Sequence, residues 1–74
     1  MLTPNEIDVI LAHVSEKMIA DGLTANFVNA CVERARTFAG MFDLLLLWRA
    51  EKDGVLREII LEDLREALGW TGDM

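Results

Sequence analysis

The sequence predicts an all-α fold, in which three antiparallel helices include one long central helix. Three observations carry this prediction. Apolar residues recur at helical spacing, caps and glycines mark helix ends, and no segment alternates apolar and polar residues as a half-buried strand does. At 74 residues the chain is expected to form one small α-helical domain over residues 1–74.

The first helix is expected over about residues 4–21. Thr3 suits the N-cap, Pro4 suits the first helical position, and Glu6 completes a capping box with Thr3. Gly22 suits the position after the last turn. Five apolar residues at helical spacing form the stripe that we expect to face the core: Ile7, Ile10, Leu11, Val14 and Met18.

The second helix is expected over about residues 25–52. Thr24 suits its N-cap, and the next strong stop signal is the turn Lys52-Asp53-Gly54. One apolar stripe continues along this helix at alternating spacings of three and four residues, which is a heptad-like seam: Val28, Cys31, Ala35, Phe38, Phe42 and Leu45. After Gly40 the opposite face becomes apolar as well.

The third helix is expected over about residues 55–68, with Gly69 after its last turn and Trp70 folding back onto that turn. Its outer face carries Glu58, Glu62 and Glu66, spaced four residues apart. The functional interpretation of this acidic face is a docking patch for a partner protein with a basic surface. The alternative interpretation is an ordinary solvated face.

The stretch Met41 to Trp48 raises the question of assembly. In an antiparallel layout the second half of the long helix has one neighbour within the chain but two apolar faces, so one face requires a second chain. We therefore expect a helical-bundle homodimer whose interface consists of Met41, Leu44, Leu47 and Trp48. The alternative is a break at Gly40, which gives four short helices and a compact monomer.

Few residues suit catalysis or metal binding. His13 and Glu16 have the spacing of a helical metal-ligand pair, but the chain has no second histidine. Cys31, the single cysteine, lies on the apolar seam and is expected to be a buried core residue. The sequence has no glycine-rich phosphate loop. We expect no enzyme, no catalytic residues, no metal site and no cofactor.

Composition limits the cellular compartments and the classes of binding partner that we expect for this protein. The net charge is −6, which disfavours nucleic acid as a partner because acidic chains repel phosphate backbones. The longest apolar run, Leu44 to Trp48, is far shorter than the roughly 20 residues that span a bilayer. The start of the chain lacks the pattern of a signal peptide, and a single cysteine fits a reducing compartment. We expect a cytoplasmic protein without membrane contact.

Two functional hypotheses follow. The first is a protein–protein interaction module, a homodimeric regulator, adaptor or inhibitor that acts by binding another protein, of the kind that phages and mobile elements also encode. The second is a small dimeric DNA-binding regulator, in which the helices on either side of the Lys52-Asp53-Gly54 turn form a helix-turn-helix. The acidic face of the last helix counts against the second hypothesis.

Overall fold

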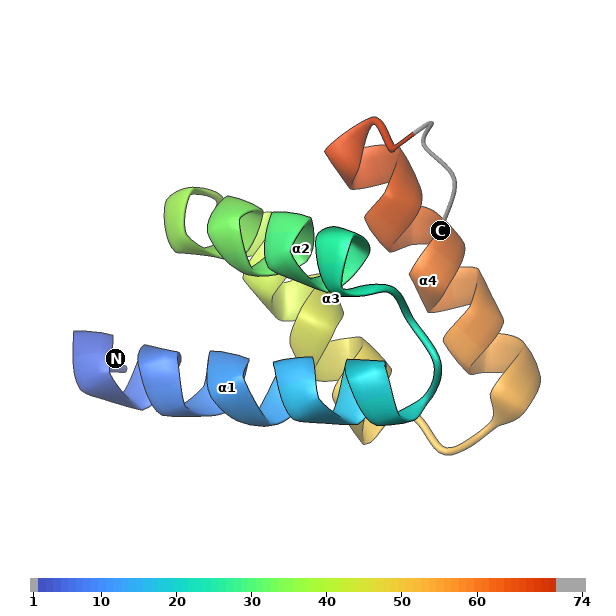
Figure 1. The fold of residues 1–74 in the computed structure, drawn as a ribbon, viewed down its shortest axis with the longest axis horizontal. Coiled ribbons are helices and arrows are strands. Elements are labelled where there is room, and N and C mark those ends of the chain that lie inside the picture. Colours follow the sequence, from blue (N-terminus) through green and yellow to red (C-terminus); the bar gives the residue numbers. More distant parts are fainter. Residues whose placement is uncertain (1, 71–74) are drawn as a thin grey trace.

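The chain folds into four α-helices, which a computed structural model describes over residues 2–70 (Figure 1). The prediction of an all-α fold is confirmed, since residues 2–70 contain no strand. No helix in this range is both long and apolar enough to cross a membrane. The helices are α1 (Pro4–Ala20), α2 (Ala25–Thr37), α3 (Ala39–Ala50) and α4 (Gly54–Leu68).

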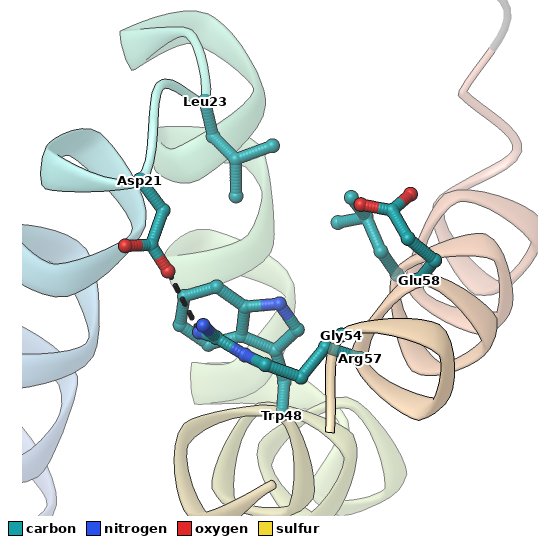
Figure 2. Close-up of a pocket in the computed structure, with 7 residues that line it drawn as sticks. Asp21, Leu23, Trp48, Gly54, Arg57 and Glu58 are labelled. Atoms are coloured by element: carbon teal, nitrogen blue, oxygen red, sulfur yellow. Dashed lines mark ion pairs between the residues drawn. The ribbon is translucent and has the colours of Figure 1, made fainter. Parts of the chain in front are cut away.

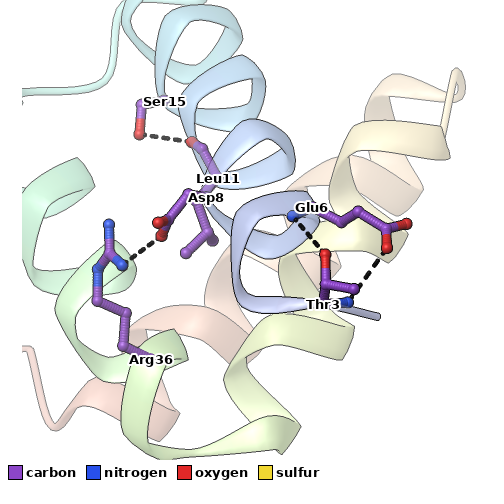
Figure 3. A network of polar contacts seen from close by, with 6 residues as sticks. All are labelled: Thr3, Glu6, Asp8, Leu11, Ser15 and Arg36. Carbon is purple, nitrogen blue, oxygen red and sulfur yellow. Dashed lines mark hydrogen bonds and ion pairs between the residues drawn. The ribbon is translucent and has the colours of Figure 1, made fainter. Parts of the chain in front are cut away.

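The start of α1 follows the predicted capping box. The Thr3 hydroxyl accepts a hydrogen bond from the Glu6 backbone N–H, and the Glu6 carboxylate accepts one from the Thr3 N–H, both at 3.2 Å (Figure 3). The helix ends before Gly22, whose φ of 94° suits glycine. Figure 3 also shows the ion pair between Arg36 and Asp8, which connects α2 to α1.

The prediction of one continuous helix over residues 25–52 is wrong, because the helix is interrupted at Phe38 and divided into α2 and α3. Phe38 is extended, with φ of −142° and ψ of 103°, and it ends one helix and begins the next. The alternative of four short helices is therefore the correct one. It placed the break at Gly40, which instead lies in the first turn of α3.

The break changes part of the predicted buried stripe. In α2 the heptad-like seam is buried as predicted, at Val28, Cys31 and Ala35. Continuing the seam would bury Phe38 next, but its side chain is exposed. The buried stripe of α3 is Met41, Leu45 and Trp48, so the predicted seam residue Leu45 is buried, whereas Phe42 is only half-buried. Helix α3 is thus turned relative to the direction that an unbroken helix would have taken.

Helix α3 lies at the centre of the fold and packs against α1, α2 and α4, whereas α1 and α4 do not pack against each other (Figure 1). Its most apolar side chains are therefore covered from within the chain. The three-helix layout left one face of this segment without a neighbour, and the additional turn at Phe38 supplies the missing neighbours. The fold itself thus accounts for most of the apolar stretch.

Helix α4 is closed at both ends by local signals. The Asp53 carboxylate accepts hydrogen bonds from the backbone N–H groups of Val55 and Leu56, at 2.9 and 3.0 Å. Gly69 adopts the left-handed conformation, with φ of 65°, after the last turn. Trp70 then contacts Phe27 of α2 edge to face, with ring centroids 5.4 Å apart. This contact packs the segment that follows α4 against the start of α2.

Two substitutions in α3 test this packing. Met41→Ala is expected to lower the free energy of unfolding by about 2–5 kcal/mol, because a fully buried side chain leaves a cavity. Leu47→Ala is expected to change it by less than about 0.5 kcal/mol, because that side chain is 57% exposed. Urea titrations followed by circular dichroism measure both values. Equal losses in the two variants would contradict the position of α3.

Candidate interaction surface

The four residues expected to form a dimer interface do not share one exposed surface. Met41 and Trp48 are buried in the core, and Leu44 is half-buried. Only Leu47 is exposed. The sequence prediction failed to anticipate this because it assigned α3 a single neighbour within the chain, whereas three helices cover it.

Trp48 belongs to a polar cluster that joins three parts of the fold (Figure 2). The Arg57 guanidinium, from the first turn of α4, lies over the Trp48 ring at 3.9 Å from its centroid. Arg57 Nη2 also lies 2.8 Å from Oδ2 of Asp21, the residue that ends α1. This cluster connects the end of α1, the end of α3 and the start of α4.

A shallow pocket of about 280 Å³ lies beside this cluster and is lined by Asp21, Leu23, Trp48, Gly54, Arg57, Glu58 and Leu61 (Figure 2). Its one cation, Arg57, is already paired with a carboxylate. The lining residues include no histidine, cysteine, serine or threonine, so they offer no pairing of a nucleophile with a base. The contacts of Arg57 connect α4 to the end of α1 and to α3 at this point.

The structure places the residues that were considered for metal binding and thiol chemistry as follows. Within residues 2–70, no three His, Cys, Asp or Glu side chains come together as metal ligands would. His13 and Glu16 are exposed on α1. Cys31 is fully buried in the core, and this burial raises the pKa of its thiol to about 12. A thiol with so high a pKa is a poor nucleophile at neutral pH.

The outer surface of α4 carries three exposed large apolar side chains, more than any other of the four helices. It has an apolar half followed by an acidic half. We define this α4 outer surface as Val55, Leu56, Glu58, Ile59, Glu62, Asp63 and Glu66, all of which are exposed. Its apolar side chains are neighbours on the helix, because residues three and four apart share a face. The sequence analysis identified the glutamates but missed the apolar half.

Charge on this surface is mostly unneutralised. Glu62 pairs with Arg65 at 2.6 Å. In the part of the chain that the structure describes, no ion pair involves Glu58, Asp63 or Glu66. Arg65 is also directed toward the Phe27 ring, at 5.7 Å from its centroid, so it lies along the inner side of α4. The surface therefore combines large apolar side chains with an excess of negative charge.

Comparisons of this chain with protein-family models, with curated proteins and with solved structures found no match.

Removal of the Arg57 side chain tests the connection that its contacts make. Arg57→Ala is expected to destabilise the fold by roughly 1–2 kcal/mol, mainly because the stem and guanidinium no longer cover Trp48. A double-mutant cycle with Asp21→Asn is expected to give a coupling energy below about 1 kcal/mol, since the ion pair is partly exposed. A coupling as large as the whole Arg57→Ala effect would show that the ion pair dominates.

Alkaline pH tests the burial of Cys31. Below pH 9 the thiol is protonated in both states, so its burial fully favours the folded chain. Above pH 9 the unfolded chain loses this proton while the folded chain keeps it until about pH 12, so stability falls. From pH 8 to pH 11, unfolding free energies of the natural chain should fall by roughly 2–3 kcal/mol more than those of Cys31→Ala. Parallel loss in both proteins would contradict this burial.

Proposed function

We propose that this chain is a protein–protein interaction module, a regulator, adaptor or inhibitor that acts by binding another protein through the α4 outer surface. The observation that carries the proposal is the exposure of Val55, Leu56 and Ile59, with Val55 71% exposed. Large apolar side chains gathered on one exposed face, beside polar residues, are typical of protein-binding sites.

The position of these residues supports a binding role more than a structural one. The core is complete without them, because α4 already buries Leu61 and Leu64 on its inner side. Much of their apolar surface therefore stays in contact with water in the folded chain, which favours a bound state in which it is covered. A rigid helix also presents them with little loss of conformational entropy on binding.

Self-association is the second candidate, and the exposure of Leu47 is the observation that favours it. The fold itself does not require a second copy. The chain exposes 4853 Å², close to the roughly 4,600 Å² typical of a folded protein of 8.3 kDa. A homodimer would thus be an association of folded chains through Leu47 and its exposed surroundings, and not the completion of a missing core.

A matched pair of substitutions tests the proposal. Ile59 on α4 and Ile19 on α1 are each 53% exposed, so lysine at either position changes exposure, charge and helix content similarly. Retention of a protein from the source cell on the immobilised chain is expected to be lost in Ile59→Lys and kept in Ile19→Lys. Quantitative mass spectrometry of the retained proteins measures the difference.

If no retained protein distinguishes Ile59→Lys from Ile19→Lys, the α4 outer surface does not carry the binding. Circular dichroism of both variants confirms that each still folds. Both residues are exposed, so neither substitution is expected to destabilise the chain by more than about 0.5 kcal/mol.

A further inference from the structure

We infer that the occupant of the α4 outer surface is an amphipathic helix of the partner protein that carries basic residues beside its apolar stripe. This inference rests on the proposed function and names the chemistry of the partner. The surface is itself a helix, and its exposed residues extend over the twelve positions from Val55 to Glu66. At 1.5 Å per residue that is about 17 Å, which matches about three turns of a packed partner helix.

The sign of the charge identifies the flanks of the partner. Four carboxylates stand on this surface, and Arg65 neutralises only one of them. An apolar partner without cations would bring the remaining acids toward a surface of low polarity and leave them without compensating charge. Lysine or arginine side chains beside the apolar contact pair with them instead. The net charge of −6 also attracts such a segment from a distance.

A second copy of the chain fits this surface less well. Each copy brings four carboxylates, whereas Lys52 is the exposed cation next to the start of α4. An antiparallel pairing of two α4 helices about Ile59 places the acidic half of each copy against the apolar half of the other. A parallel pairing places acids opposite acids, which is repulsive. Nucleic acids and anionic membranes are repelled by the same charge.

Two synthetic peptides test the inference by fluorescence anisotropy. The first is an amphipathic peptide of about 18 residues with leucine at i, i+3 and i+4 spacing and lysine elsewhere, long enough to form a helix. The second carries glutamate at each lysine position. The lysine peptide is expected to bind the natural chain in a salt-sensitive manner, and the glutamate peptide is expected not to bind.

Matched variants show where the lysine peptide binds. Ile59→Lys is expected to weaken binding at least about tenfold, whereas Ile19→Lys is expected to change it less than about threefold. For charge, the double variant Asp63→Asn with Glu66→Gln is expected to weaken binding more than Glu16→Gln with Glu33→Gln, although both pairs remove two negative charges. All four of these acids are exposed.

Several results would overturn the inference. The first is that the lysine peptide does not bind. The second is that the two peptides bind equally. The third is that Ile59→Lys and Ile19→Lys weaken binding equally, which would indicate attraction to net charge alone. Light scattering provides another. If the natural chain has a mass above 8.3 kDa and Ile59→Lys returns it to the monomer mass, the occupant of the surface is a second copy. If cellular retention depends on Ile59 while the lysine peptide fails to bind, only the partner chemistry is wrong. If retention does not depend on Ile59 either, the proposed function fails too.

Discussion

The rest of the structure depends on one constraint, which is that the apolar side chains of α3 must be buried by the other helices. This helix has the most apolar sequence of the four, and most of its side chains must be removed from water. In its central position α3 packs against α1, α2 and α4. The turn at Phe38 allows the chain to place α3 there. Because α1 and α4 do not pack on each other, each buries its apolar stripe against the α2–α3 pair between them.

Local signals were enough to predict three of the helix boundaries closely. The capping box at Thr3 and Glu6, the Thr24 cap and the left-handed Gly69 each involve residues within one turn, so their chemistry can be read along the chain. The core stripe of α1 was predicted for the same reason, since helical spacing alone places Leu11, Val14 and Met18 on one face. No tertiary information is needed for either kind of feature.

The break at Phe38 could not be predicted in this way. Phenylalanine is neither of the usual helix-breaking residues, proline and glycine. Phe38 also caps α3 without a side-chain hydrogen bond. Its extended conformation is favoured by the burial of Met41, Leu45 and Trp48, which depends on helices distant in the sequence. The same limit applies to the site. The glutamates of α4 were evident from charge, but the exposure of Val55, Leu56 and Ile59 follows from which face α4 turns toward α3.

The contacts of Trp48 and Trp70 have a spectroscopic consequence. The chain contains two tryptophans and no tyrosine, so its intrinsic emission on excitation at long wavelength comes from these two rings alone. Trp48 lies under the guanidinium of Arg57 near the start of α4, and Trp70 contacts Phe27 beyond its end. The two fluorophores thus report separately on the two ends of one helix. Replacing either by phenylalanine leaves a built-in optical probe for the opposite end.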